Sequence, residues 1–349
     1  MKSIYIVTGA CGHLGNTIVR KLIDRGETVR GFALPSDPAE ALPAGVVLTR
    51  GDVRDKDSMR PLFDRQADEQ LIVIHTAAVI SIRSRLTQAL RQVNVQGVKN
   101  VVELCREYGA RRLVYVSSVH ALPEQPGHGQ IAETDEFHPA WVRGAYAKTK
   151  AEATDYVLRQ AEAGLDVVVV HPSGIIGPGD YGENHLNHML RDCMTGKLRA
   201  AVKGGYNFVD VRDVADGCIA AADRGVKGEC YILSGRHYDI KELLELVKEQ
   251  GGNYRIRAYL PVGLAKLAAP FFQLADKVHR RQPLFTSYSM DTMKSNDHFS
   301  NKKARTQLGF RVRSMKETVR DTVSWLRARE KPKPAEGHES HKQTVKAAG

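Results

Sequence analysis

The sequence predicts an α/β fold built on a doubly wound parallel sheet, with a smaller subdomain toward the C-terminus. Short apolar runs such as 71–74 and 167–170 alternate with helical patterns through the first half of the chain. Runs that are apolar at every position are typical of strands whose two faces are both covered by helices. The chain has 349 residues, which suffices for one large domain with a smaller partner.

The first strand is followed at once by a glycine-rich turn. The apolar, β-branched run 3–8 ends at Thr8, three glycines follow at three-residue spacing, and a helical pattern then begins. A helix N-terminus favours an anionic phosphate, and glycine lets the backbone turn sharply and come close to it. This turn therefore predicts a nucleotide-binding site formed by Gly9, Cys11, Gly12, His13, Leu14 and Gly15.

The remaining elements of the first half repeat the strand–helix alternation. A ligand of such a sheet lies beyond the carboxyl ends of its strands, and the unusual residues of this chain follow strand patterns. We expect further strands at 28–33, 46–48, 71–74, 112–116 and 167–170, and helices at 56–67, 86–108 and 146–163.

The second half is less regular. We expect helices at 184–194, 211–222, 240–249, 262–277 and 313–329, and a strand at 231–233. Residues 1–172 are predicted to form a dinucleotide-binding domain to which 208–235 return, while 173–207 and 236–330 form a substrate-binding subdomain. Residues 331–349 begin with Lys-Pro-Lys-Pro, continue with polar residues, and are predicted to be a disordered tail.

Charge and cysteine content limit the class of protein. The net charge is +11, which a solvated surface and an anionic cofactor account for; no nucleic-acid partner is expected, because no recognised module accompanies the charge. Contact of the apolar helix 262–277 and its basic neighbours with an anionic membrane surface is a lesser alternative. No transmembrane segment is expected, since the apolar stretch 259–275 is too short and too interrupted.

Five scattered cysteines favour neither a metal site nor disulfides, and with no visible signal peptide they indicate a cytoplasmic protein.

Tyr146 and Lys150 lie four residues apart on a predicted helix, so their side chains share one face. A free tyrosine has a pKa of about 10, and a nearby cation lowers that pKa by stabilising the phenolate. Tyr146 can then exchange a proton with a carbonyl or an alcohol near neutral pH. Taken alone, such a pair is more typical of a solvated helix face. Ser117 and Ser118 follow a strand about 30 residues earlier, where a hydroxyl can polarise the same oxygen.

The order of these motifs resembles the extended short-chain dehydrogenase/reductases, which include NAD-dependent epimerases and dehydratases, dihydroflavonol reductases and 3β-hydroxysteroid dehydrogenases. The resemblance covers residues 3 to 329. It is carried by Thr8-Gly9-x-x-Gly12-x-x-Gly15, Asp52-Val53, His75-Thr76-Ala77-Ala78, Val93-Asn94-Val95-x-Gly97, Tyr146-x-x-x-Lys150, Phe208-Val209-Asp210-Val211-x-Asp213-Val214-Ala215 and Lys303-Ala304-x-x-x-Leu308-Gly309-Phe310.

This resemblance implies a catalytic set of Ser118, Tyr146 and Lys150, with Ser117 as the alternative hydroxyl. Tyr146 would be the acid/base, and Lys150 would lower its pKa and hold the nicotinamide ribose. The resemblance also implies a homodimer formed through helices 86–108 and 146–163, and no metal. Tyr146 is also implied to contact the cofactor. Further cofactor contacts are implied for Asp52 and Val53 at the adenine, for Ala77, Ala78 and Asn94 along the cofactor, and for Pro172 and Ser173 near the nicotinamide.

Three departures from the family's sugar-nucleotide enzymes narrow the substrate. Val119 and His120 stand where the 4,6-dehydratases carry an Asp-Glu pair, and Gly174 stands where many of these enzymes carry an asparagine. The apolar segment 260–274 and residues 283–286 resemble the reductase and steroid-dehydrogenase branch. We therefore expect a small-molecule ketone or alcohol of low polarity. His120 either touches this substrate or is a loop histidine without such a role.

The choice between NAD and NADP is poorly signalled. Ala33 and Leu34 occupy the end of the second strand, where an acidic residue would favour NAD and an arginine NADP. Asp37 comes late, after a proline, and Arg30 is basic, so NADP is slightly favoured. Two rival functions stay open: a nucleotide-sugar epimerase that keeps its NAD, and a cofactor-binding sensor or scaffold with little turnover.

Overall fold

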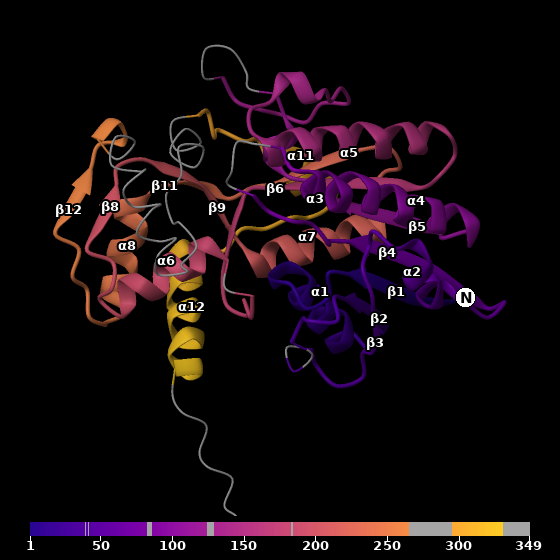
Figure 1. Ribbon diagram of the computed structural model, residues 1–349, viewed down its shortest axis with the longest axis horizontal. Helices are drawn as coiled ribbons and strands as arrows, with labels where there is room; N and C mark the ends of the chain where they lie inside the picture. Colours follow the sequence, from indigo (N-terminus) through magenta and orange to yellow (C-terminus); the bar gives the residue numbers. More distant parts are fainter. Residues whose placement is uncertain are drawn as a thin grey trace, which may run out of the picture.

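A seven-stranded parallel sheet forms the centre of the protein (Figure 1). The structure is a computed structural model that describes residues 1–38, 40, 42–81, 86–123, 129–182, 184–264 and 295–330. The strands run in the order β10-β6-β5-β4-β1-β2-β3, so the chain starts in the middle and builds outward on both sides. This confirms the predicted doubly wound sheet. The strands are β1 (Lys2–Thr8), β2 (Thr28–Ala33), β3 (Val47–Arg50), β4 (Glu69–His75), β5 (Arg112–Val116), β6 (Val167–Pro172) and β10 (Cys230–Leu233).

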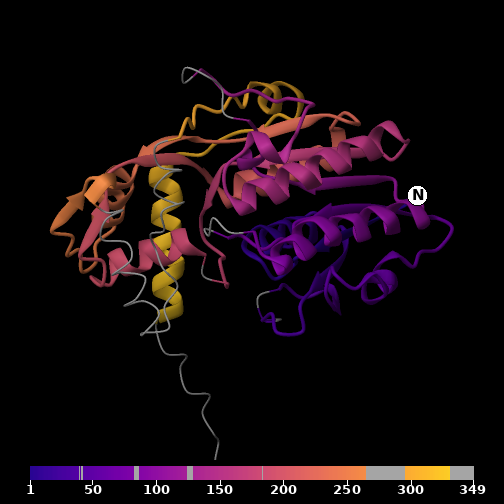
Figure 2. The ribbon, with the colours of Figure 1, turned by 45° about the horizontal axis from the view of Figure 1, so that its top comes forward.

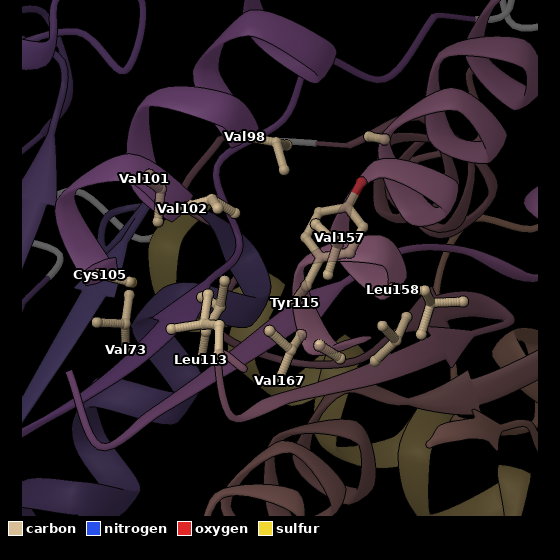
Figure 3. Close-up of a cluster of buried hydrophobic side chains, with 14 of the residues drawn as sticks. Val73, Val98, Val101, Val102, Cys105, Leu113, Tyr115, Val157, Leu158 and Val167 are labelled. Carbon is tan, nitrogen blue, oxygen red and sulfur yellow. The ribbon is translucent and has the colours of Figure 1, made fainter. Parts of the chain in front are cut away.

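Helices cover both faces of this sheet, because each presents an apolar stripe to it. One face packs against α2 (Lys56–Phe63), α4 (Gly97–Glu107) and α5 (Ala145–Glu162), and Figure 3 shows part of the resulting core. The opposite face packs against α1 (His13–Asp24), α7 (Val211–Arg224) and α11 (Lys302–Gln307). Tyr115 is fully buried in the first core, yet its hydroxyl oxygen points out of the cluster (Figure 3).

A second group of elements has a core of its own beside the sheet (Figure 2). It contains a three-stranded sheet in the order β11-β9-β7 and a two-stranded sheet of β8 and β12. Residues 208–210 lie in β9, whereas α7 and β10 return to the large sheet; the division into two functional domains stays a prediction. The elements are β7 (Gly174–Ile176), α6 (His185–Met194), β8 (Ala200–Val202), β9 (Gly205–Asp210), β11 (Arg236–Asp239), α8 (Ile240–Glu249), β12 (Ala258–Leu260) and α12 (Met315–Glu330).

The helix expected over 86–108 is interrupted. Its first part is the short α3 (Gln88–Arg91), a π-helical turn follows at Gln92–Gln96, and α4 continues from there. A π-turn inserts an extra residue into the helical ladder, so the side chains after it are rotated relative to those before it. Asn94 lies within this turn and is buried.

Two sequence predictions lie outside the described residues: most of the apolar helix 262–277 with its basic neighbours, and the tail 331–349. Among the residues that the structure describes, no helix is long and apolar enough to cross a membrane.

Candidate active site

The glycine turn after β1 is a cradle that side chains would fill. Gly9 has a φ of +69°, which disfavours any residue with a Cβ. A Cβ at Gly15 would lie 2.1 Å from the carbonyl oxygen of Gly9, and a Cβ at Gly9 would lie 2.9 Å from the Ala77 backbone. Gly12 is the N-cap of α1. The turn therefore brings a helix N-terminus to the strand ends with room for a phosphate group.

The other predicted residues of this turn have different surroundings. Cys11 and Leu14 are buried beneath it. The His13 ring lies 3.1 Å from the Pro178 carbonyl oxygen through Nε2, and 3.1 Å from the Asn184 amide nitrogen through Nδ1. Burial lowers the pKa of His13, so the ring is neutral near pH 7. Its ring thus ties the turn to the segment between β7 and α6.

Strand β4 ends next to this turn. The Thr8 hydroxyl lies 2.7 Å from His75 Nδ1, and the Thr76 hydroxyl donates to the Thr8 carbonyl oxygen at 2.7 Å. Ala77 donates its backbone N–H to the Thr8 hydroxyl at 3.4 Å and packs against Gly9, and Ala78 follows half-buried. These contacts bring the predicted Ala-Ala pair to the glycine turn.

The Asn94 side chain binds the backbone of the loop that follows Ala77 and Ala78. Its side-chain oxygen accepts from the Val79 N–H at 2.8 Å, and its amide nitrogen donates to the Val79 carbonyl at 3.0 Å. The same nitrogen donates to the Thr149 hydroxyl at 3.1 Å. These hydrogen bonds of Asn94 are thus with Val79 and Thr149, and its predicted contact with the cofactor stays a prediction.

Arginines surround the predicted adenine end of the site. The Asp52 carboxylate accepts from the Arg54 guanidinium at 2.6 to 3.0 Å, which holds the pKa of Asp52 below its usual value. The Arg50 guanidinium, at the end of β3, donates to the carbonyl oxygens of Leu34 at 2.6 Å and of Asp37 at 2.8 Å. Sequence reasoning missed Arg50, because it examined the end of β2 and this side chain comes from the neighbouring strand.

The two serines after β5 have separate roles in the structure. The Ser117 hydroxyl lies 2.7 Å from the Thr154 hydroxyl on α5, and both side chains are buried. The Ser118 hydroxyl accepts from the His120 backbone N–H at 3.2 Å. Ser117 is therefore tied to the helix packing, whereas Ser118 lies beside the residue that contacts Tyr146.

Lys150 is buried, with only 3% of its surface exposed. Its ammonium group donates to the Val116 carbonyl oxygen at 2.7 Å and to the Tyr115 hydroxyl at 3.5 Å. Burial disfavours the charged form and lowers the pKa of Lys150 to about 7. Tyr146 lies one turn earlier on α5 and is also buried. The pKa of Tyr115 is raised well above its usual value by burial and by the nearby Tyr146, so three polar groups gather at this point.

Buried polar atoms at the end of β6 fit a ligand. Pro172 ends the strand, and the Ser173 hydroxyl after it is buried and has no hydrogen-bond partner within the described part of the chain. The same is true of His171 Nε2, while His171 Nδ1 lies 3.0 Å from the Ser118 carbonyl oxygen. Buried polar groups are nearly always hydrogen-bonded, so a bound molecule that supplies partners fits here.

His120 lies between Tyr146 and Tyr206 of β9. Its ring stacks on Tyr206 with centroids 5.6 Å apart and an interplanar angle of 14°, and its Nε2 lies 3.1 Å from the Tyr206 hydroxyl. Its ring meets Tyr146 edge-on, with centroids 6.2 Å apart. Burial lowers the pKa of His120 to about 4, so this ring is neutral at pH 7.

Comparison with known proteins places this chain in one family. A sequence model of the NAD dependent epimerase/dehydratase family matches residues 5–239. "Sterol demethylase protein B" of Methylococcus capsulatus is 35% identical over 334 residues, which cover 93% of this chain and 98% of the relative. A 3-beta-hydroxysteroid dehydrogenase of Mycolicibacterium neoaurum is 28% identical over 327 residues, which cover 87% of this chain and 86% of the relative. The crystal structure of gox2253 has a TM-score of 0.79 and 28% identity, and covers 94% of this chain and 98% of that chain.

Proposed function

This chain belongs to the NAD dependent epimerase/dehydratase family and is an NAD(P)-dependent oxidoreductase of the extended short-chain type, and we propose that its substrate is a secondary alcohol or ketone on an apolar ring skeleton. The observation that carries the proposal is that Ser118, Tyr146 and Lys150 lie near the carboxyl ends of the central strands, as does the glycine turn. Relatives named for sterols and hydroxysteroids support the substrate class. The exposed apolar side chains of Ile80 and Trp141, on segments next to site residues, support it as well.

In the direction of oxidation, the Ser118 hydroxyl holds the substrate oxygen beside Tyr146. The Tyr146 phenolate accepts the proton of the substrate hydroxyl as the C–H bond breaks. A nicotinamide held near Pro172 and Ser173 would supply the hydride acceptor that this two-electron oxidation needs. In its protonated form Lys150 favours the phenolate through its positive charge, and it would donate to the ribose of a bound cofactor. Ser173 and His171 supply polar atoms for the neighbouring part of the cofactor.

Replacement of Tyr146 by phenylalanine tests this mechanism. We expect Tyr146→Phe to lower kcat for a secondary alcohol by at least about 100-fold, because general acid–base catalysis contributes on this order. The Kd for the cofactor should change less than threefold. Tyr156→Phe, on the same helix, is the matched control and should keep wild-type turnover. Full turnover by Tyr146→Phe would overturn the assigned role.

We also propose NADP as the preferred cofactor. Ala33 and Leu34 offer no carboxylate to the ribose hydroxyls, and Arg50 lies beside the loop after β2, where a 2′-phosphate would lie. Isothermal titration should give a lower Kd for NADPH than for NADH. Arg50→Gln should raise the NADPH Kd about tenfold and the NADH Kd less than threefold, a difference that separates phosphate binding from loop distortion. Tighter binding of NADH by the wild-type protein would contradict this assignment.

A nucleotide-sugar epimerase of the same family would use the same residues. Such an enzyme keeps its cofactor, so NAD that survives gel filtration would favour it, and rapid exchange favours the proposed reductase. NADPH binding without turnover of any ketone or alcohol would instead favour a sensor or scaffold.

We further propose a cytoplasmic homodimer that packs through α4 and α5, as the family resemblance implies. Light scattering that gives the mass of one 38.6 kDa chain would exclude the dimer. Fractionation of the native cells tests the compartment.

A further inference from the structure

We propose that Tyr206 and His120 form a flat aromatic wall that selects a rigid ring skeleton and excludes a nucleotide sugar. This inference rests on the proposed function and deepens it, because it assigns the substrate class to two particular side chains. Both residues lie outside the catalytic set, and they come from different sheets of the fold: His120 follows β5, and Tyr206 lies in β9.

The first argument is the crowding at Gly174, the position where many sugar-nucleotide enzymes of the family carry an asparagine. A Cβ at Gly174 would lie 2.9 Å from Cδ1 of Tyr206, 3.1 Å from Cδ1 of Phe208 and 3.0 Å from the Asn207 carbonyl oxygen. The space that an asparagine side chain would need is thus filled by aromatic rings from β9. At this position the chain therefore has a glycine packed against aromatic rings.

The second argument is the contact between this surface and the catalytic tyrosine. Tyr206 stacks on His120, and His120 meets the Tyr146 ring edge-on. The backbone of His120 also donates to the Ser118 hydroxyl. The wall therefore begins at the two groups that hold the substrate oxygen, so a molecule bound there has its carbon skeleton next to the wall.

The third argument is the polarity of the wall. The Tyr206 hydroxyl and His120 Nε2 lie 3.1 Å apart and satisfy each other, and the His120 ring is neutral at pH 7. The 4,6-dehydratases of the family carry a carboxylate at the position of His120, which water elimination needs. A neutral, hydrogen-bonded aromatic pair instead presents uncharged ring surface, which favours contact with an apolar skeleton.

Equilibrium dialysis with a radiolabelled 3β-hydroxysteroid and NADP+-loaded protein tests the wall without requiring turnover. We expect Tyr206→Leu to raise the steroid Kd at least tenfold, because leucine keeps apolar volume and loses the flat ring. Tyr206→Phe keeps the ring and should stay within threefold of wild type. Tyr156→Leu is the matched control and should leave the steroid Kd unchanged. The NADPH Kd and the melting temperature of each variant report whether the fold is intact.

The outcomes separate this inference from the proposed function. A wild-type protein that binds the steroid and loses affinity in Tyr206→Leu supports the wall, even if no alcohol is turned over and the proposed oxidoreductase substrate fails. Equal steroid affinity in Tyr206→Leu and wild type overturns the wall, even if turnover is found. Equal losses in Tyr206→Phe and Tyr206→Leu would assign binding to the hydroxyl and also overturn it. Absence of steroid binding, or binding of UDP-glucose in titration calorimetry, would overturn the substrate class.

Discussion

The burial of Lys150 predicts an unusual pH dependence of stability. Its pKa is lowered from 10.5 to about 7 in the folded protein, because the ammonium group is desolvated. Below pH 7 the lysine is charged in both the folded and the unfolded state, so the desolvation penalty is complete. As the pH rises from 7 to about 10, the folded state loses its proton first and the penalty disappears. This lysine therefore makes the folded state more stable with rising pH in that window.

Replacement by the uncharged Lys150→Met removes this dependence. The difference in unfolding free energy, variant minus wild type, should fall between pH 6 and pH 9.5 by at most about 3 kcal/mol, from about 1.4 kcal/mol for each unit of pKa shift. The lost hydrogen bond to the Val116 carbonyl costs about 1 kcal/mol at every pH. It therefore lowers the difference in unfolding free energy equally at all pH values and leaves its pH dependence unchanged.

Urea unfolding of the cofactor-free protein at pH 6, 7.5 and 9.5 measures this difference. Contributions of titrating groups that do not interact with Lys150 cancel when the variant is subtracted from the wild type. The charge of Lys150 also lowers the pKa values of His75 and His171, but these lie at about 3 and 4 in the folded protein, below this pH window. Lys148→Met, on the exposed side of the same helix, is the control and should give a difference that is constant with pH. A difference for Lys150→Met that stays constant within 0.5 kcal/mol (about the precision of the measurement) would refute the argument that Lys150 is desolvated.

Two further predictions concern the cofactor turn and the serine pair. Gly15→Ala should raise the NADPH Kd at least about fivefold, because its Cβ would lie 2.1 Å from the Gly9 carbonyl oxygen and overpacking costs about 1–3 kcal/mol. In Gly129→Ala the new Cβ meets nothing within 4 Å, so this control should bind NADPH as the wild type does, and equal affinities in both variants would contradict the cradle. Ser118→Ala should lower kcat by about 100-fold in steady-state kinetics, as the loss of a donor to a reacting oxygen does. Ser117→Ala should keep its kcat and lower the unfolding free energy, measured by urea unfolding, by about 1 kcal/mol. The reverse pattern would exchange the roles of the two serines.

Features that depend on nearby residues were predictable from the sequence. The glycine turn follows from three glycines and the strand before them, and the turn, its helix and the parallel sheet are found as expected. The joint placement of Tyr146 and Lys150 on α5 follows from their four-residue spacing. The helix over 86–108 was predicted without its π-turn, because periodicity alone does not reveal an inserted residue.

Features that depend on distant residues were not predictable. The different surroundings of the two serines depend on Thr154 of α5, whose hydroxyl lies 2.7 Å from the Ser117 hydroxyl. Arg50 reaches the loop after β2 only because β3 pairs with β2 in the sheet.

By itself, the sequence determined the family, the sheet and the glycine turn after the first strand, because each of these is encoded in a few consecutive residues. The tertiary structure alone decided how deeply the residues of these motifs are buried and which distant side chains contact them. It buries Lys150 against Tyr115, and it brings Tyr206 from 86 positions away onto His120. Desolvation and aromatic contact arise only when separate segments pack together, so the lowered pKa of Lys150 and the contact between Tyr206 and His120 are fixed by packing rather than by local pattern.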